Sequence, residues 1–259
     1  MQFETLLTEE VDSIIILTIN RPESLNALNK QIFDDLEYLF YEYIPSVEGL
    51  RGIVLTGAGE KAFVAGADIK EFSSYGVEAL TALSKNGQRI FAQIEKCHVP
   101  VIAAVNGFSL GGGCELAMSC HMRIAAENAR FGQPEVNLGL IPGYGGTQRL
   151  PKLIGYTRAM ELLLTARIID AYEAEKIGLV NKVVPVGQSL ASAKELINTI
   201  ATKGPIAISK TIESVNALYD VKDGFDEEAR LFGECAATKD FIEGTTAFIE
   251  KRKANFTNS

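Results

Sequence analysis

Two glutamates stand alone in glycine-rich segments that carry no other charge. Glu115 follows Gly111-Gly-Gly113 in a small and apolar stretch, and Glu135 ends the segment Phe131-Gly-Gln-Pro-Glu135. Burial in such surroundings would raise the pKa of a carboxyl group and suit it to proton transfer. Neighbouring carboxyl groups can also divide acid and base roles between them. Two alternatives stay open, in which Glu115 only complements a helix dipole and Glu135 is a turn residue beside a helix N-cap.

The stretch Gly107–Gly113 predicts backbone N–H groups at the entrance of a helix. Three successive glycines cost backbone entropy, so they indicate unusual torsions or close approach to bare backbone. Unpaired N–H groups at a helix start stabilise an oxyanion or a phosphate, although tight helix–strand packing is an alternative. The chain lacks both the Walker sequence and the G-x-G-x-x-G fingerprint at this place. Gly66 and Ala67 would supply a second N–H, since oxyanion sites usually need two donors.

The pentapeptide Gly107-Phe-Ser109-Leu-Gly111 also matches the nucleophile elbow of serine hydrolases, G-x-S-x-G, which lies between a strand and a helix. Such hydrolases place an acid and then a histidine after the serine. The only histidine after Ser109 is His121, which is expected on the same helix and cannot easily reach back to its first turn. The hydrolase interpretation therefore lacks a base.

These segments require an α/β fold to position them. The β-branched runs Ser13–Ile19, Arg51–Thr56 and Val99–Val105 predict strands that are covered on both faces. Amphipathic helices are expected around residues 32–43 and 80–94, and they provide the crossovers that parallel strands need. The third strand is expected to run directly into the glycine-rich turn.

The chain becomes mostly helical after Gly155. One further strand is expected at Leu179–Val184. The predicted helices are Thr157–Leu164, Ala171–Ile177, Gln188–Ala201, Ile206–Leu218 and Phe225–Arg252. We therefore divide the chain into a core at residues 1–195 and a C-terminal helical region at residues 196–259, which packs on the core or between subunits.

Composition excludes several classes of protein. The 259 residues are 47% hydrophobic and have a net charge of −8 without a basic cluster, which argues against disorder and against a nucleic-acid partner. The longest apolar runs are far shorter than the roughly 20 residues that span a membrane. The first residues lack the pattern of a secretion signal, so we expect a cytoplasmic protein without a membrane partner. The four cysteines and two histidines lack zinc-site spacing, and we expect no metal.

Four motifs follow one another along the chain. They are Ala65-Gly-Ala-Asp-Ile-Lys-Glu71, Gly111-Gly-Gly-Cys-Glu-Leu-Ala-Met118, Phe131-Gly-Gln-Pro-Glu135 and Ile141-Pro-Gly-Tyr-Gly-Gly-Thr-Gln-Arg-Leu150. Together they resemble the enoyl-CoA hydratase (crotonase) family, and the likeness extends from Arg21–Leu28 to Gly244–Phe256. The resemblance implies a spiral of ββα units with a C-terminal trimerisation region, and trimers that pair into a homohexamer.

The resemblance also implies roles for particular residues. Ala67 and Gly112 would donate backbone N–H groups to the carbonyl oxygen of a thioester. Glu115 would position and activate water for attack at Cβ, and Glu135 would supply the proton to Cα. Gly143 would hold the water through its N–H group. Losing one oxyanion donor typically costs about 2.7–4 kcal/mol in the reaction barrier.

Coenzyme A is expected to be part of the substrate, so no separate cofactor is needed. By the same resemblance it would lie along Ala27, Ala65, Asp68, Ile69 and Lys70. Gln133 would support the two carboxylates, and the segment Glu71–Asn86 is expected to shape the pocket. The chain lacks the basic residue that many family members have near Glu23-Ser24, and we interpret His121 as structural.

The leading hypothesis is reversible hydration of a trans-2-enoyl-CoA to the 3-hydroxyacyl-CoA. The alternative within the family is enoyl-CoA isomerisation, which generally needs only the second acid, and the presence of Glu115 argues against it. A protein that binds CoA thioesters without turnover is the alternative from another class. The pathway stays open among fatty-acid oxidation, butyrate metabolism and aromatic-acid degradation.

Overall fold

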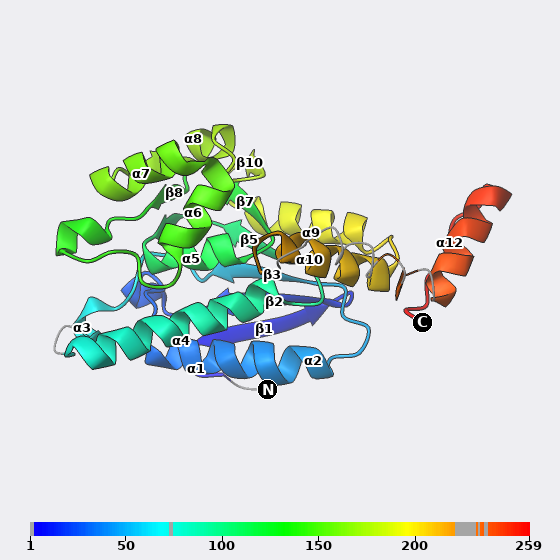
Figure 1. Ribbon diagram of the computed structural model, residues 1–259, viewed down its shortest axis with the longest axis horizontal. Coiled ribbons are helices and arrows are strands. Elements are labelled where there is room, and N and C mark those ends of the chain that lie inside the picture. The colour runs from blue at the N-terminus through cyan, green and yellow to red at the C-terminus, as the bar shows by residue number, and fades with distance from the viewer. Residues whose placement is uncertain (1–2, 73–74, 221–231, 233, 236–237) are drawn as a thin grey trace.

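Two β-sheets organise the chain in the computed structural model, which describes residues 3–72, 75–220, 232, 234–235 and 238–259 (Figure 1). The strands of the larger sheet are, in spatial order, β1 (Leu6–Val11), β2 (Ile14–Ile19), β3 (Gly52–Gly57), β5 (Val101–Val105), β7 (Met122–Ala126) and β10 (Lys182–Val184). The smaller sheet contains β4 (Ala62–Val64), β6 (Phe108–Leu110), β8 (Arg130–Gly132) and β9 (Ile169–Asp170). The β1–β2 and β8–β9 pairs are antiparallel, and the other pairs among the described strands are parallel.

A repeated ββα unit connects the two sheets. The strands β3, β5 and β7 lie side by side in the larger sheet, and the short strands β4, β6 and β8 that follow them lie side by side in the smaller one. Helical segments then lead to the next unit: α3 (Ile69–Phe72) and α4 (Val77–Glu95), α5 (Gly112–Ser119), and η3 (Glu135–Leu138) with α6 (Gly146–Ile154). Parallel neighbours need such crossovers. This arrangement confirms the predicted α/β spiral.

The central strands are buried on both faces, as their continuous β-branched sequences predict. Side chains alternate between the faces, so Ile53 and Leu55 join the main core while Val54 belongs to a second cluster. Helix α9 (Ser189–Ile200) covers that second cluster with Ala193 and Ile197. Both faces of the sheet are therefore closed, which holds the ends of its strands in fixed positions.

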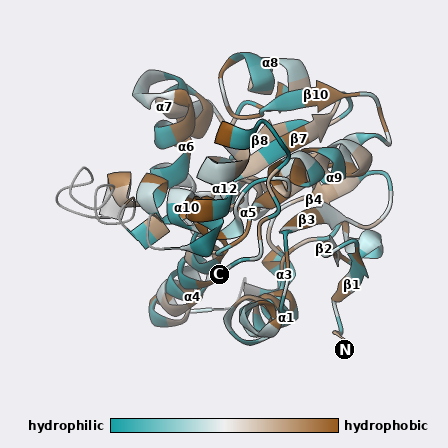
Figure 2. Ribbon diagram, turned by 90° about the vertical axis from the view of Figure 1, so that its right-hand side faces the viewer, coloured by the Kyte–Doolittle hydropathy of each residue, from teal (hydrophilic) through white to brown (hydrophobic). Residues whose placement is uncertain are grey.

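The remaining helical segments surround the sheets. They are η1 (Pro22–Ser24), α1 (Lys30–Tyr38), the π-helical η2 (Leu39–Tyr43), α2 (Ile44–Ser46), α7 (Tyr156–Thr165), α8 (Ala171–Lys176), α10 (Pro205–Asp220) and α12 (Lys239–Glu250). Figure 1 shows α12 standing apart from the sheets at the C-terminal end of the molecule. Figure 2 shows that the helices around the sheets carry both hydrophilic and hydrophobic residues. Within the described ranges, no helix is both long and apolar enough to cross a membrane.

The structure corrects several strands of the sequence analysis. Val99–Val105 does not run directly into the glycine-rich turn, because β5 ends at Val105 and β6 intervenes before α5. The sequence analysis also missed β1, an edge strand whose polar residues weaken the apolar pattern. It missed β7 in the larger sheet and the short strands β4, β8 and β9 in the smaller sheet as well. Part of the helix predicted at Phe225–Arg252 lies outside the described residues. The division after residue 195 stays a prediction, and α9 is continuous across that point.

Candidate active site

A cavity of about 510 Å³ lies between α4, α5 and η3. Both isolated glutamates, Glu115 and Glu135, contribute to its lining. Ala67, Gly112 and Gly143 line the same cavity. The fold therefore brings together the two acids and the three backbone positions that the sequence analysis singled out, although they come from four separate segments of the chain.

The entrance of α5 requires glycine at two positions. Gly111 adopts φ +49° and ψ −123°, in the left-handed half of φ space that L side chains avoid. A Cβ atom on Gly113 would lie 1.9 Å from the carbonyl oxygen of Val64. Gly112 between them is the first helical residue, so its N–H group has no partner within the helix. The glycines thus let the N-terminal end of α5 lie against the cavity without side chains that would cover its backbone amides.

The backbone around Ala67 is fixed by a short bridge to Leu28. Leu28 forms a parallel bridge with Ala67, in which the Leu28 N–H donates to the Gly66 carbonyl at 2.9 Å. The Asp68 N–H donates to the Leu28 carbonyl at 2.7 Å. Because these bonds use the groups that flank Ala67, its own N–H points away from Leu28. Ala67 and Gly112 both line the cavity, and the joint action of their N–H groups there stays a prediction.

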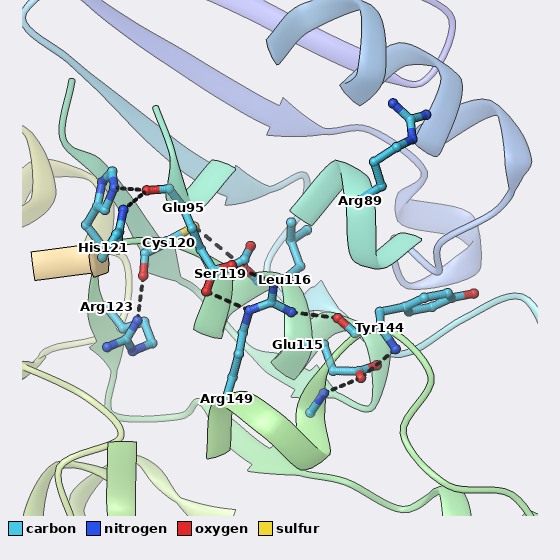
Figure 3. Close-up of polar contacts among 12 residues, drawn as sticks. Arg89, Glu95, Glu115, Leu116, Ser119, Cys120, His121, Arg123, Tyr144 and Arg149 are labelled. Atoms are coloured by element: carbon cyan, nitrogen blue, oxygen red, sulfur yellow. Dashed lines mark hydrogen bonds and ion pairs between the residues drawn. The ribbon is translucent and has the colours of Figure 1, made fainter. Parts of the chain in front are cut away.

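Glu115 is almost completely buried, with 1% of its surface exposed. Its Oε1 accepts hydrogen bonds from the backbone N–H groups of Tyr144 and Gly146, both at 2.7 Å (Figure 3). Its pKa is raised from 4.5 to about 7; burial is the main cause, the nearby Glu135 carboxylate acts in the same direction, and the two amides and Arg149 act in the opposite direction. A carboxyl group with this pKa can both take and give a proton near neutral pH.

Glu135 begins the short 3-10 helix η3 and is only partly buried. Burial raises the pKa of its carboxyl group as well. When the side-chain amide of Gln133 is oriented with its nitrogen toward Glu135, that nitrogen lies 3.3 Å from both carboxylate oxygens. A Cβ atom on Gly111 would lie 2.6 Å from Oε1 of Glu135. Glu135 therefore occupies space that opens only because residue 111 is glycine.

Helix α4 fixes the position of Gly143. The Gly143 carbonyl accepts hydrogen bonds from Ser84 Oγ at 2.5 Å and from Gln88 Nε2 at 3.0 Å. Five residues of the segment Glu71–Asn86, which was expected to shape the pocket, line the cavity: Leu80, Thr81, Leu83, Ser84 and Lys85. That expectation is confirmed.

Two of the residues predicted to bind the substrate line the cavity. Ala65 and Ile69 line the cavity, whereas Ala27, Asp68, Lys70 and Gln133 are not among the described residues that line it. Arg21 connects two of them, because its guanidinium donates to the Ala27 carbonyl at 2.6 Å and pairs with Asp68 at 3.2 Å. Their contact with a ligand stays a prediction.

The rival serine site is not assembled. Ser109 lies fully buried in β6, and its Oγ donates to the Gly113 carbonyl at 3.2 Å. His121 is occupied on both ring nitrogens, since Nδ1 accepts from the Val101 N–H and Nε2 contacts the Glu95 carbonyl, each at 2.9 Å (Figure 3). The structural interpretation of His121 is confirmed, and the match to the nucleophile elbow was misleading.

The sequence analysis missed the residues that hold Glu115. The amides of Tyr144 and Gly146 bind its carboxylate, and Arg149 contacts the Tyr144 carbonyl. All three lie in the fourth motif, so their segment was identified but their function was not. Glu95, which pairs with Arg149, gave no signal because the two residues are 54 positions apart in sequence.

The comparison with protein families agrees with this geometry. The sequence model of the enoyl-CoA hydratase/isomerase family matches residues 9–259. The chain belongs to this family. Its crotonase-like fold accounts for the arrangement of two sheets joined by ββα units, and membership is consistent with acids from separate segments meeting in one cavity.

Relatives within the family are similar along almost their whole length. The chain is 46% identical over 255 residues to a short-chain-enoyl-CoA hydratase of Clostridium acetobutylicum, covering 98% of this chain and 97% of that protein. It is 47% identical to a crotonyl-CoA hydratase of Syntrophomonas wolfei, covering 99% of each chain. The crystal structure of an enoyl-CoA hydratase from Bacillus anthracis superimposes with a TM-score of 0.93 at 38% identity, covering 99% of this chain and 100% of that one.

Proposed function

We propose that the protein is an enoyl-CoA hydratase, a lyase that adds water reversibly and in the syn sense to a trans-2-enoyl-CoA. The observation that carries this proposal is the meeting of Glu115 and Glu135 in one cavity beside the amides of Ala67 and Gly112. Attack of water at Cβ places enolate charge on the thioester oxygen. Two fixed N–H groups stabilise that charge at the moment it develops.

The two carboxyl groups divide the proton transfers. Glu115, whose Oε1 is held by two amides, positions water and takes its proton during hydration, and Glu135 delivers a proton to Cα. In dehydration the roles reverse. The Gly143 N–H group holds the water, and Gln133 supports Glu135. Because the carboxyl groups share one water molecule, the pH dependence of the rate reports on the pair.

The substrate is proposed to carry a short acyl chain. The ring of Tyr144 packs edge-on against Phe33 and Phe91, with centroid distances of 5.0 and 5.8 Å, and Tyr144 lines the cavity. We infer that this ring forms the end of the acyl pocket. Gly87 on α4 makes room for this ring, since a Cβ atom there would lie 2.3 Å from Tyr144. The names of the Clostridium and Syntrophomonas relatives support the same substrate class.

Coenzyme A arrives as part of the substrate along Ala27, Ala65, Asp68, Ile69 and Lys70, and no separate cofactor takes part. The chain is proposed to act in the cytoplasm, in a pathway of fatty-acid metabolism. The location is supported by its four cysteines, which are all free thiols although three are buried.

The active form is proposed to be a homohexamer, a dimer of trimers. Large apolar side chains on α10 and α12 support an interface between copies, because they are exposed in the single chain. They are Val215, Leu218, Phe241, Ile242 and Ile249. Sedimentation at several protein concentrations tests the assembly.

A spectrophotometric assay with crotonyl-CoA tests the activity, because hydration removes the absorbance of the conjugated thioester. We expect turnover by the wild type and 3-hydroxybutyryl-CoA as the product. Turnover of a 3-enoyl-CoA to the 2-enoyl isomer without hydration would favour the isomerase instead, and tight binding without turnover would favour a binding protein. Ser109→Ala is expected to retain hydration, which a serine hydrolase would not do.

A panel of enoyl thioesters tests the chain-length proposal. We expect kcat/KM to fall as the acyl chain lengthens beyond crotonyl. Tyr144→Ala opens the space between α5 and α4, so it is expected to raise the relative rate on longer substrates roughly tenfold. The control is Phe91→Leu, which removes the aromatic contact with the Tyr144 ring but leaves that ring in the protein. An unchanged profile in Tyr144→Ala would refute the assignment of this ring as the end of the pocket.

A further inference from the structure

A bidentate ion pair joins α6 to the end of α4. Arg149 on α6 donates to Glu95 at the end of α4 through Nε at 2.8 Å and Nη2 at 2.7 Å (Figure 3). The Arg149 side chain is only 11% exposed and Glu95 is 35% exposed, so water screens this pair less than a surface pair. The fork geometry of the guanidinium fixes the orientation of the pair as well as its distance.

Arg149 also binds the Tyr144–Gly146 turn, whose backbone amides bind the Glu115 carboxylate. Its third nitrogen, Nη1, donates to the Tyr144 carbonyl at 2.6 Å. The amides of Tyr144 and Gly146 then bind Glu115 Oε1 at 2.7 Å each. Gly145 between them adopts φ +107°, and a Cβ atom there would lie 2.2 Å from Arg149 Nη1. The turn and the guanidinium are therefore packed into contact, with no room for a side chain at residue 145.

The other end of the pair is anchored by two further elements. The Glu95 carbonyl accepts from Nδ2 of Asn216 on α10 at 2.7 Å, and it contacts Nε2 of His121 at 2.9 Å (Figure 3). Glu95 is thus fixed through its backbone from the C-terminal helical region and from the end of α5. Its carboxylate transmits that position to α6 through Arg149.

We propose that Glu95 and Arg149 are positioning residues for catalysis, because they hold the Tyr144–Gly146 turn whose amides orient the Glu115 carboxylate. The expected fall in the hydration rate rests on the proposed function. The expected change in the pKa of Glu115 does not depend on any substrate.

Four titratable groups face the Glu115 carboxyl group from the elements packed against it. They are Arg149 on α6, Glu135 on η3, Tyr144 in the turn and Cys114 on α5. Arg149 lowers the pKa of Glu115, and so do the two amides of the turn. Loss of the guanidinium removes its positive charge and loosens both amides, so the ionised form of Glu115 becomes less favourable. The pKa of Glu115 then rises, and the acid limb of the pH–rate profile moves to higher pH.

Three variants separate charge from geometry. Arg149→Met removes both, Arg149→Lys keeps the charge but loses the fork, and Glu95→Gln keeps the guanidinium but loses its anionic partner. We expect kcat for crotonyl-CoA to fall roughly 10- to 100-fold in Arg149→Met, with a smaller change in KM. The acid limb should shift upward in Arg149→Met and much less in Arg149→Lys. Arg167→Met is the matched control, because Arg167 pairs with Glu161 and Glu173 on the surface.

A direct titration of Glu115 provides a readout that does not depend on turnover. Carboxyl-carbon NMR of the glutamate-labelled protein follows its pKa, with Glu115→Gln identifying the signal. A wild type that fails to hydrate crotonyl-CoA would refute the proposed function, while an upward shift of this titration in Arg149→Met would still support the positioning role. Wild-type kcat together with an unshifted titration in Arg149→Met and Glu95→Gln would overturn the inference. If Arg149→Met does not fold, Glu95→Gln and Asn216→Ala give the same test with smaller expected effects.

Discussion

The two walls of the cavity differ in how firmly they are held. All eight residues of α5, which carries Glu115, are buried, and two backbone amides bind the carboxylate. The η3 wall, which carries Glu135, contains no buried residue: its Leu138 is 55% exposed, and Ile141, which follows it, is 71% exposed. The comparison indicates that packing and hydrogen bonds hold the Glu115 carboxylate in place, whereas fewer buried contacts hold the residues of η3.

Replacement of each acid tests both walls with the largest expected effect. Glu115→Gln and Glu135→Gln should each lower kcat for crotonyl-CoA by roughly 10²–10⁴-fold, the range typical of general acid–base catalysis. Glutamine at residue 115 keeps an oxygen that accepts from Tyr144 and Gly146, so the fold should be retained. Glu42→Gln, on an exposed part of η2, is the control. Intact turnover in Glu115→Gln would remove it from the mechanism.

The pH dependence of stability sharpens the comparison. Burial raises the folded-state pKa of Glu115 to about 7, so folding favours its protonated form. The associated stability is fully present below pH 4.5 and is lost as pH rises toward 7, an effect of about 3 kcal/mol. We therefore expect the unfolding free energy of the wild type to fall relative to that of Glu115→Gln over this range. Urea unfolding of both proteins at several pH values measures the difference, and parallel curves would contradict it.

One substitution in the α5 wall and one in the η3 wall compare how much packing in each wall contributes to the unfolding free energy. Gly113→Ala places a Cβ atom 1.9 Å from the Val64 carbonyl oxygen and should lower the unfolding free energy by about 1–3 kcal/mol. Leu138→Ala on the open wall removes a half-exposed side chain and should change it by less than about 0.5 kcal/mol. Gly76→Ala is the control for a glycine with free space around it. Equal losses in both walls would refute the difference in packing.

The smallest effect concerns substrate binding by the open wall. Leu138→Ala should raise KM for crotonyl-CoA roughly fivefold with kcat nearly unchanged, because the lost apolar contact, worth about 1 kcal/mol, serves the ground state and transition state alike. Steady-state kinetics distinguishes this from a loss of kcat, which would place Leu138 in control of the chemistry instead.

The sequence predicted the two acids and the glycines of the site, but not the residues that hold Glu115 in position. Glu115 and Glu135 could be identified because each is an isolated charge in an apolar, glycine-rich segment, and that pattern is local. The partnership of Glu95 with Arg149 could not be identified, since it depends on where α4 ends relative to α6. Ser109 misled the motif search for a related reason: the intervening strand β6 turns its side chain into the interior, and only tertiary structure reveals that strand.

Gly111 lies where the entrance of α5 meets the side chain of Glu135. A methyl group at this position would lie 2.6 Å from the Glu135 carboxylate oxygen and 3.9 Å from Gly66 Cα. It would also strain a backbone with φ +49° immediately before Gly112. A single substitution at this glycine is therefore expected to disturb the acid and the start of α5 together.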